Sequence, residues 1–277
     1  MDLTAFTIVL FAAVLHASWN AIVKGTEDKT LTTVLVIGAA GGVSACMLPF
    51  CPLPGSSSWP FLLASVLLQI LYCVLVARTY HVSDISVAYP VMRGVPPLIV
   101  AVCGVLYFDE FLSVSGWAGV GLISAGILMF APSRRRNGGG VPPLALLNGC
   151  VIAAYTLIDA AGVRLSESPI GYTLWIYALT GSVFVGWAAA TRFGELRSYT
   201  ARYWHVGLIG GIGAVGSYGL VLWAMTLAPV AMVAALREVS IPVGALIGVL
   251  VLGEKFTIGK LFAICGIVTG ALMIRMS

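Results

Sequence analysis

Long apolar stretches without a single Asp, Glu, Lys or Arg recur along the chain. They cover residues 30–77, 111–133, 168–191 and 203–236. A helix crosses the hydrocarbon core of a bilayer with about 20 mostly apolar residues, so each stretch has room for one crossing or two. A membrane-spanning β-barrel would instead alternate apolar and polar residues along each strand. Residues 62–68 carry apolar side chains on both faces, which favours helices over a barrel.

Charges, prolines and glycine clusters divide these stretches into ten expected spans that are joined by short connections. The spans cover residues 3–23, 34–53, 61–80, 85–107, 114–131, 144–163, 172–191, 204–226, 229–252 and 258–275. The pattern therefore predicts an all-α membrane protein with ten transmembrane helices and no soluble domain. The start, Met1-Asp2-Leu3, lacks the basic region and cleavage site of a secretory signal, so we expect the first span to be retained.

Composition supports the same fold class and narrows the possible partners. Of the 277 residues, 60% are hydrophobic and 9% are charged, whereas an ordinary soluble domain carries about 25% charged residues. A disordered chain is poor in apolar residues, so disorder is excluded as well. The net charge of +4 is small and dispersed, and we expect no nucleic-acid partner. The six cysteines form no C-x-x-C pair, so we expect no disulfide and no metal site.

One motif in the chain is misleading. Residues 211–216 read Gly-Ile-Gly-Ala-Val-Gly, which matches the G-x-G-x-x-G of dinucleotide-binding proteins. That motif requires a preceding strand, and here it lies inside an expected span, where glycines allow helices to approach closely. Gly266 and Gly270 form a similar small-residue face. The chain also lacks H-E-x-x-H and G-x-S-x-G, so we expect no enzyme activity, no catalytic residue and no cofactor.

The two halves of the chain resemble each other. Equivalent residues recur 144 positions apart: Arg93 and Arg237, Glu110 and Glu254, Gly126 and Gly270. Each repeat contains five expected spans, and because five is odd, the second copy enters the membrane in the opposite orientation. Inverted repeats of this kind occur in secondary transporters, with the substrate site near the membrane midplane. We therefore expect one repeat in residues 1–131, a basic, glycine-rich linker in 132–143, and a second repeat in 144–277.

The distribution of Lys and Arg predicts the orientation. With ten spans, one face carries Lys24, Lys29, Arg78, Arg134, Arg135, Arg136, Arg192, Arg197, Arg202, Lys255 and Lys260. The other face carries only Arg164 and Arg275. Cytoplasmic loops are richer in Lys and Arg, so we expect the linker and the loop with Arg192 in the cytoplasm, and both termini outside. Glu110 and Glu254 are then expected on opposite membrane surfaces.

Two arginines lie at the centres of expected spans. Arginine at a helix centre costs at least about 2.5–3.5 kcal/mol on insertion scales, so Arg93 and Arg237 are expected to face a cavity or a charged partner. Their guanidinium groups suit a substrate carboxylate, phosphate or phosphonate. Alternatively, Glu238 neutralises one of them in a buried pair. Both interpretations hold if Glu238 releases its arginine on protonation.

Prolines interrupt the same two spans. Pro90, Pro96 and Pro97 lie in the fourth span, and Pro229 and Pro242 in the ninth. Proline frees backbone carbonyls that a cavity or a neighbour must satisfy, so these residues are candidates for hinges, with simple packing kinks as the alternative. Tyr89 lies one turn before Arg93 and shares its face.

Further polar and aromatic side chains are candidates for the substrate site. His16, Trp19 and Asn20 are spaced to share a face of the first span, where the alternative is hydrogen bonding between helices. His16 is also considered as a proton-coupling group. Asp159 lies near an end of its span, where the interface or Arg164 would satisfy it. The aromatic candidates for stacking on substrate, with interfacial anchoring as the alternative, are Tyr72, Tyr155, Tyr218 and Trp223.

Three local patterns resemble the EamA-type ten-helix carriers of the drug/metabolite transporter superfamily. Residues 16–24 are similar to the aromatic-Asn-Lys ending of the family's first helix, and residues 86–94 look like its fourth helix. Each half also has a glutamate, Glu110 or Glu254, before its last helix. The resemblance covers the whole chain and implies a membrane carrier, with export favoured. The chain departs from the usual pattern by its two central arginines, so substrates of better-known members are not transferred to it.

These features together predict an inner-membrane secondary transporter that acts by alternating access. Its expected partners are the lipid bilayer and a small anionic or zwitterionic metabolite, such as an amino acid or a phosphonate-type anion, with protons or a counter-substrate as candidates for coupling. The chain is expected to be a monomer or a weak homodimer. A flippase for lipids or lipid-linked sugars is the alternative function. A membrane scaffold ranks below both, because it needs neither buried arginines nor broken helices.

Overall fold

The computed structural model describes residues 1–24, 26, 28–131, 142–252 and 257–277. The elements in this part of the chain are all helical. In chain order they are α1 (Leu3–Lys24), α2 (Lys29–Met47), the 3-10 turns η1 (Leu48–Phe50) and η2 (Ser56–Ser58), α3 (Trp59–Val82), α4 (Ile85–Gly94), α5 (Pro96–Phe108), α6 (Val114–Leu128), α7 (Pro143–Leu165), α8 (Pro169–Met225), α9 (Val230–Arg237), α10 (Ser240–Leu252) and α11 (Ile258–Met276).

Eight helical stretches among the described residues are long and apolar enough to cross a membrane. They include α4 with α5 as one stretch, α9 with most of α10 as another, and α8 as a third. The α6 helix is shorter but also apolar. The molecule is thus an all-α, multi-pass membrane protein. The sequence predicts where the linker and Glu254 lie, but Glu254 and most of the linker are outside the described residues.

The α8 helix contains two of the expected spans and also the segment between them, which the sequence analysis treated as a loop. That expectation is wrong, because residues 193–202 form a helical segment between the two spans. The backbone leaves helical geometry only at Arg192 (φ −140°, ψ 37°) and Tyr203 (φ −119°, ψ 17°). The chain therefore turns between the two expected spans without losing most of its helical hydrogen bonds.

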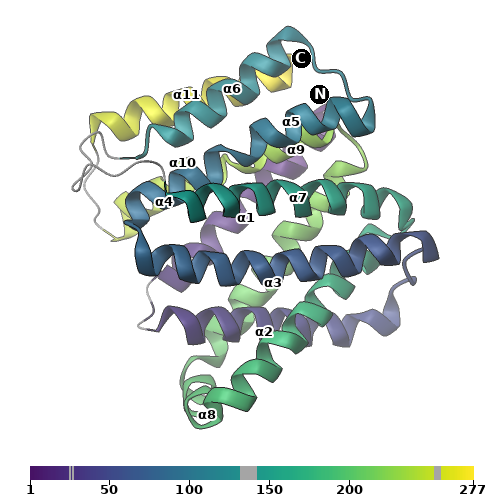
Figure 1. Ribbon diagram of the computed structural model, residues 1–277, viewed down its shortest axis with the longest axis vertical. Coiled ribbons are helices and arrows are strands. Elements are labelled where there is room, and N and C mark those ends of the chain that lie inside the picture. Colours follow the sequence, from purple (N-terminus) through teal and green to yellow (C-terminus); the bar gives the residue numbers. More distant parts are fainter. Residues whose placement is uncertain (25, 27, 132–141, 253–256) are drawn as a thin grey trace.

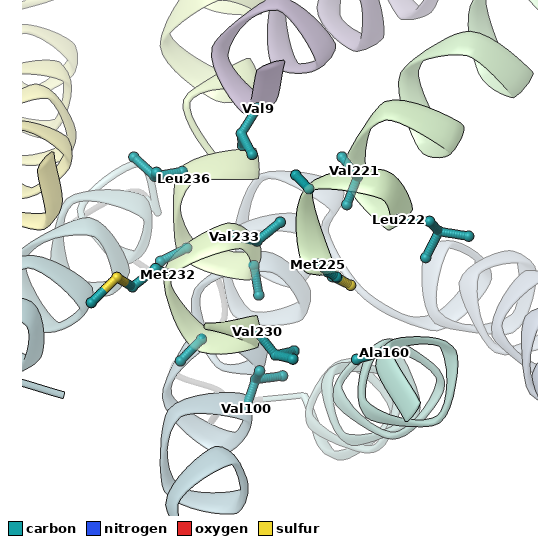
Figure 2. Packing of buried hydrophobic residues seen from close by; sticks show 14 of the residues in the cluster. Val9, Val100, Ala160, Val221, Leu222, Met225, Val230, Met232, Val233 and Leu236 are labelled. Carbon is teal, nitrogen blue, oxygen red and sulfur yellow. The ribbon is translucent and has the colours of Figure 1, made fainter. Parts of the chain in front are cut away.

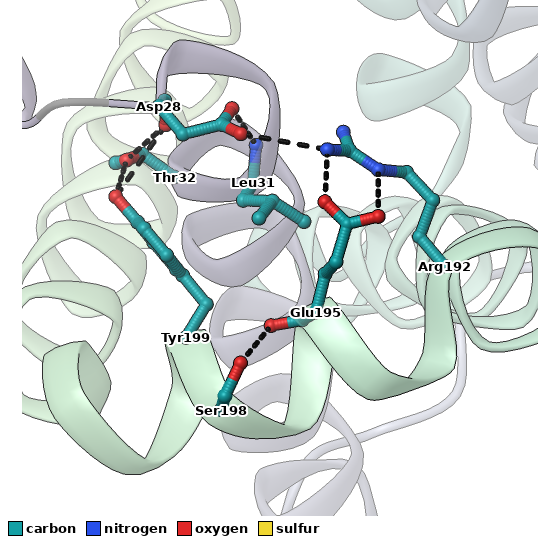
Figure 3. A network of polar contacts seen from close by, with 7 residues as sticks. All are labelled: Asp28, Leu31, Thr32, Arg192, Glu195, Ser198 and Tyr199. Atoms are coloured by element: carbon teal, nitrogen blue, oxygen red, sulfur yellow. Dashed lines mark hydrogen bonds and ion pairs between the residues drawn. The ribbon is translucent and has the colours of Figure 1, made fainter.

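A polar network holds this turn against the start of α2 (Figure 3). Arg192 pairs with Glu195 on the same helix and lies 3.6 Å from a carboxylate oxygen of Asp28. Asp28 also caps α2 by accepting a hydrogen bond from the Leu31 amide at 2.9 Å. The hydroxyl of Tyr199 lies 2.6 Å from that of Thr32. These contacts explain why a segment rich in arginine is ordered as a helix rather than as an open loop.

Two pairs of short helices replace single long ones in the middle of the molecule. The helix that begins with α4 is interrupted at Val95, after which α5 starts with Pro96 and Pro97. Proline is well tolerated at the first positions of a helix, because the amide it lacks would have no partner there. The second interruption covers residues 238–239, between α9 and α10.

The remaining three expected hinge prolines lie in or beside these short helices. Pro90 is inside α4, Pro229 is the N-cap residue of α9, and Pro242 is the third residue of α10.

Most of the helices run side by side across the view in Figure 1, with α6 and α11 paired at one edge, while α8 crosses α2 obliquely at the other edge. The α9 helix lies in the interior, and all eight of its residues are buried. Figure 2 shows its Val230, Met232, Val233 and Leu236 packed among side chains from neighbouring helices. The core therefore surrounds one of the two interrupted helices.

Glycines bring several helices into close contact, as the sequence predicted. A Cβ atom on Gly211 of α8 would lie 2.7 Å from the Ala40 amide nitrogen of α2. A Cβ atom on Gly270 of α11 would lie 2.6 Å from the Gly119 carbonyl oxygen of α6. Since real Cβ atoms do not approach so closely, these glycines are needed for the observed packing, and the helix-packing interpretation of residues 211–216 is confirmed.

The two ends of the chain meet. The Arg275 guanidinium donates a hydrogen bond to the Met1 carbonyl oxygen at 2.8 Å, and both termini lie at the same end of the bundle (Figure 1).

Candidate functional site

A cavity of about 860 Å³ occupies the middle of the bundle. Its walls come from α1, α2, α3, α4, α7, α8, α9, α10 and α11. Nine of the ten residues that the sequence nominated for substrate binding line it: His16, Trp19, Asn20, Tyr72, Tyr89, Arg93, Tyr155, Tyr218 and Arg237. The tenth, Glu238, is buried and contacts both arginines. The tertiary structure thus brings the nominated side chains together.

The cavity reaches one end of the bundle. From Arg93 and Arg237 in the middle, its lining continues to Asn20 near the end of α1, Lys29 at the start of α2 and Lys260 near the start of α11. All three of these positions lie at the same end, because α1 runs toward it while α2 and α11 run away from it. The site is therefore accessible from this end, which we call the open end.

Three charged side chains form the polar centre of the cavity. Arg93 Nε lies 2.9 Å from Glu238 Oε2, and Arg237 Nε lies 3.7 Å from Glu238 Oε1. The side chains of Arg93, Arg237 and Glu238 are 11%, 8% and 2% exposed. Neither Nε atom has hydrogen-bond geometry toward a partner within the described chain, so both contacts are ion pairs at an unfavourable angle.

One carboxylate therefore serves two guanidinium groups. The sequence suggested that Glu238 neutralises an arginine, and the adjacent Arg237 was the natural partner. In the structure the shorter contact is with Arg93, from the other half of the chain. With all three groups ionised, this cluster carries one excess positive charge beside the cavity. Guanidinium groups have five N–H donors each, so donors remain for an anionic ligand.

The α1 side chains lie on the cavity wall at helical spacing. The rings of His16 and Trp19 meet edge to face, with centroids 5.3 Å apart. The Asn20 amide donates to the His16 carbonyl oxygen at 2.8 Å, within its own helix. Among the described residues, Asn20 makes no hydrogen bond to another helix, which was its expected alternative role. The buried Trp19 indole nitrogen has no hydrogen-bond partner in the described part of the chain.

Tyrosines supply most of the aromatic surface. Tyr72 and Tyr155 meet edge to face with ring centroids 6.0 Å apart, and Tyr177 and Tyr218 do so at 6.2 Å. Tyr177 also lines the cavity, although the sequence analysis did not nominate it, since nothing in its span distinguishes it from an interfacial tyrosine. Trp223 is 45% exposed and lies outside the cavity lining.

Asp159 contradicts its sequence-based interpretation. It was expected to reach the membrane interface or Arg164, but its side chain is fully buried. One carboxylate oxygen accepts a hydrogen bond from Tyr172 at 3.1 Å, and the other accepts a short one from Tyr218. The helix places Asp159 more than one turn from the end of α7, so its carboxylate faces the bundle interior.

Arg164 instead joins several helices at the end of the bundle opposite the open end. Its guanidinium lies 2.5 Å from a carboxylate oxygen of Glu110, and its Nε donates to the Met225 carbonyl oxygen at 2.9 Å. The second oxygen of Glu110 accepts a hydrogen bond from the Val230 amide at 2.7 Å, which caps α9. This cluster of Arg164 and Glu110 connects the ends of α5, α7 and α8 to the start of α9. We call this end of the bundle the closed end.

Comparisons with known proteins agree with this architecture. A family model described as the EamA-like transporter family matches residues 142–276, and one described as Small Multidrug Resistance protein matches residues 43–123. None of the curated proteins matches the chain significantly. One solved structure, described only as the crystal structure of a protein, aligns over 99% of this chain and 98% of its own with a TM-score of 0.75. At 18% identity, that likeness concerns the fold alone.

Proposed function

Because this chain belongs to the EamA-like transporters, a family of membrane carriers for small molecules rather than of enzymes, we propose that it is a secondary carrier for a small anionic or zwitterionic metabolite. The carrier works by alternating access, as an exporter or an exchanger. Its energy comes from a gradient or from exchange. The observation that carries this proposal is the pair of arginines, Arg93 and Arg237, at a central cavity with only one carboxylate between them.

The charge of this pair favours an anion. Two guanidinium groups repel a simple cation, and their planar donors match carboxylate, phosphate and phosphonate oxygens. The substrate group binds between Arg93 and Arg237 on the cavity side, opposite Glu238. The aromatic lining, which includes Tyr72, Tyr155 and Trp19, packs against the rest of the substrate.

Ten spans in two inverted repeats fit this proposal. The α8 helix, 57 residues long and turned at Arg192 and Tyr203, counts as two crossings, and the short α6 helix counts as one. The repeats are residues 1–131 and 144–277, joined by 132–143. The interruption at Val95 recurs 144 positions later at Val239, within the break between α9 and α10.

A reciprocal contact between α6 and α11 also supports the repeat. A Cβ atom on Gly126 would lie 2.9 Å from the Ala263 carbonyl oxygen, and one on Gly270 would lie 2.6 Å from that of Gly119. The offset of 144 residues relates Gly119 to Ala263 and Gly126 to Gly270. Each contact therefore becomes the other when the halves are exchanged, as expected for a two-fold axis between them.

The open end of the cavity faces the cytoplasm in this proposal. The described basic residues near that end are Lys29, Arg78, Arg192, Arg197, Arg202 and Lys260, whereas Arg164 and Arg275 are at the closed end. The positive-inside rule then assigns the open end and the linker to the cytoplasm and both termini to the outside. Release outward requires the closed end to open, with movement at the breaks beside Pro90, Pro96, Pro97, Pro229 and Pro242.

Transport itself is tested in proteoliposomes. Proteoliposomes that contain the purified chain are loaded with one compound at a time from a panel of carboxylates, amino acids and phosphonates. Counterflow of the same compound in radiolabelled form is then measured. We expect counterflow for at least one anionic or zwitterionic compound, and its loss in Arg93→Gln. Arg197→Gln is the matched control, because Arg197 is exposed and does not line the cavity. Counterflow of cations alone, or of lipid headgroup compounds alone, contradicts the proposal.

Orientation is tested by labelling single cysteines in a cysteine-free background. Ser198→Cys lies on the exposed helical segment beside Arg197, and Ser57→Cys lies on the exposed turn between α2 and α3, at the closed end. A membrane-impermeant reagent added to intact cells should label Ser57→Cys and should label Ser198→Cys only after permeabilisation. The reverse pattern contradicts the proposed orientation.

A further inference from the structure

Asp159 is a buried carboxylate to which the proposed anion site assigns no role. It lies on α7 with 0% exposure. The hydroxyls of Tyr172 and Tyr218 each donate to one of its oxygens. No ion pair joins it to a Lys or Arg of the described chain. Its polar contacts within the described chain are thus with neutral hydroxyls only.

Asp159 does not line the cavity itself, but one of its two hydrogen-bond partners does. Tyr218 lines the cavity and donates to Asp159 from that side. On the opposite side, Tyr172 is completely buried and packs so closely on α7 that a Cβ atom on Gly162 would lie 2.3 Å from its hydroxyl oxygen. A proton can therefore reach Asp159 from the cavity through the Tyr218 hydroxyl, while the side of Tyr172 is sealed.

The charges in the middle of the bundle balance. The buried charged side chains in the described interior are Arg93, Arg237, Glu238 and Asp159. When all four are ionised, their sum is zero, and a bound anion brings it to one negative charge. An uncompensated charge is costly in a membrane interior. The uptake of one proton removes this cost.

We propose that Asp159 takes up one proton when an anion binds between Arg93 and Arg237, so that the anion and the proton cross together. This inference rests on the proposed function. The proton comes from cavity water and adds to the Asp159 oxygen that faces Tyr218. The Tyr218 hydroxyl relays it by giving up its own proton and receiving another. No other bond changes.

Asp159 is the acceptor rather than Glu238 because their partners differ. Glu238 contacts two guanidinium groups, and adding a proton to it would leave both of them without their counter-charge. The titratable and charged groups that face Asp159 are Tyr155 on its own helix, Tyr172, Tyr177 and Tyr218 on α8, and Arg237 on α9. From α3 it meets Ser65, which does not titrate. Arg237 lies beyond ion-pair distance from Asp159 and interacts with its charge only at longer range.

The first test needs no ligand. Replacing Arg93 by glutamine removes one positive charge, which changes the charge balance as a bound anion does. Infrared spectra of the full chain in lipid, with carbon-13 in the aspartate carboxyl groups, report protonated aspartate by its carbonyl stretch. We expect this band at neutral pH in Arg93→Gln, its absence in the wild type, and its loss in Arg93→Gln with Asp159→Asn. Arg237→Gln is the second variant if Arg93→Gln does not fold.

The carbon-13 label distinguishes Asp159 from the alternative acceptor, Glu238, because only aspartate carboxyl groups carry it. If the new band lacks the carbon-13 shift and is lost with Glu238→Gln, Glu238 takes the proton and the inference is wrong. If no band appears in either arginine variant, no carboxyl responds to the charge balance and the inference is also wrong.

The second test uses methanesulfonate, an anion whose charge does not change with pH. Proton uptake is measured with a pH dye in weakly buffered detergent solution. We expect about one proton for each bound anion in the wild type and none in Asp159→Asn, which still binds. Binding without proton uptake in the wild type overturns the inference, and if methanesulfonate does not bind, the infrared result decides. Both tests are independent of flux, so failure of the counterflow assay with a positive infrared result would affect the proposed function alone.

Discussion

The two interrupted helices place the same arginine but not the same neighbour. In the first half Arg93 is followed by Gly94, and in the second half Arg237 is followed by Glu238. A Cβ atom on Gly94 would lie 2.9 Å from Leu128 Cγ, so α4 is too close to α6 for a larger side chain there. Glu238 instead reaches both arginines. The two interrupted helices thus supply two cations at equivalent positions but only one adjacent anion, which leaves one excess positive charge within the cluster of Arg93, Arg237 and Glu238.

The starts of the two helices differ as well. Asp84 caps α4 locally by accepting a hydrogen bond from the Ser86 amide at 2.9 Å. The α9 helix is capped by Glu110, which comes from the other half of the chain and also pairs with Arg164. The first cap lies at the open end and the second at the closed end. We infer that the cap between halves holds one end shut, while the local cap leaves the other end free to move.

The largest expected effect comes from removing the shared anion. Glu238→Gln leaves two buried guanidinium groups without a counter-charge, and losing one partner of a buried ion pair costs about 3–5 kcal/mol. Unfolding of the purified chain in detergent measures this loss. The double variant Arg237→Gln with Glu238→Gln should recover much of the stability but not transport. Equal stability of Glu238→Gln and wild type would mean that the anion is not shared in this way. Glu195→Gln, on the exposed turn, should change little.

The next effect concerns the two cations. Arg93→Lys and Arg237→Lys keep the charge but lose the planar fork, so each should weaken substrate binding about tenfold or more. Transport should fall more than the amount of folded protein. Concentration dependence of counterflow, normalised to folded protein, measures it. Wild-type transport by both variants would make the arginines structural.

A smaller effect sharpens the difference between Gly94 and Glu238. Gly94→Ala forces a methyl group against Leu128 and should destabilise the chain by about 1–3 kcal/mol. Gly121→Ala on α6 is the matched control, because a Cβ atom there meets nothing within 4 Å. Thermal unfolding should separate the two variants. If Gly94→Ala is as stable as Gly121→Ala, steric exclusion does not explain the glycine.

The smallest effect on stability distinguishes the two caps. Asp84→Ala should cost about 1 kcal/mol, as for the loss of an ordinary N-cap, without changing access at the closed end. Glu110→Gln should instead raise the labelling rate of a cysteine at buried Val100, near the closed end, by an impermeant reagent from outside. Equal labelling in the wild type, Asp84→Ala and Glu110→Gln would mean that the Glu110 cap does not hold this end shut.

Much of the fold and of the cavity lining follows from local pattern. Apolar length predicts the membrane crossings because the bilayer has a fixed thickness. An arginine within such a stretch must face the interior, so Arg93 and Arg237 could be nominated without a structure. Helical spacing likewise places His16, Trp19 and Asn20 on one wall.

Contacts between helices could not be read from the same pattern. Asp159 was expected near Arg164, but the rotation of α7 turns Asp159 toward Tyr172 and Tyr218 and leaves Arg164 to Glu110. Tyr177 has no distinguishing neighbour in its sequence, yet it lines the cavity.

The sequence by itself determined the membrane class, the positions of most of the apolar helices and the two central arginines, because each depends on spacing within a segment. Only the tertiary structure decided that one glutamate serves both arginines, that residues 193–202 are helical, and that the cavity opens at one end. The physical reason is that these features depend on the rotation and depth of each helix relative to its neighbours. Close packing between helices sets this rotation and depth, and the sequence of a single segment does not determine them.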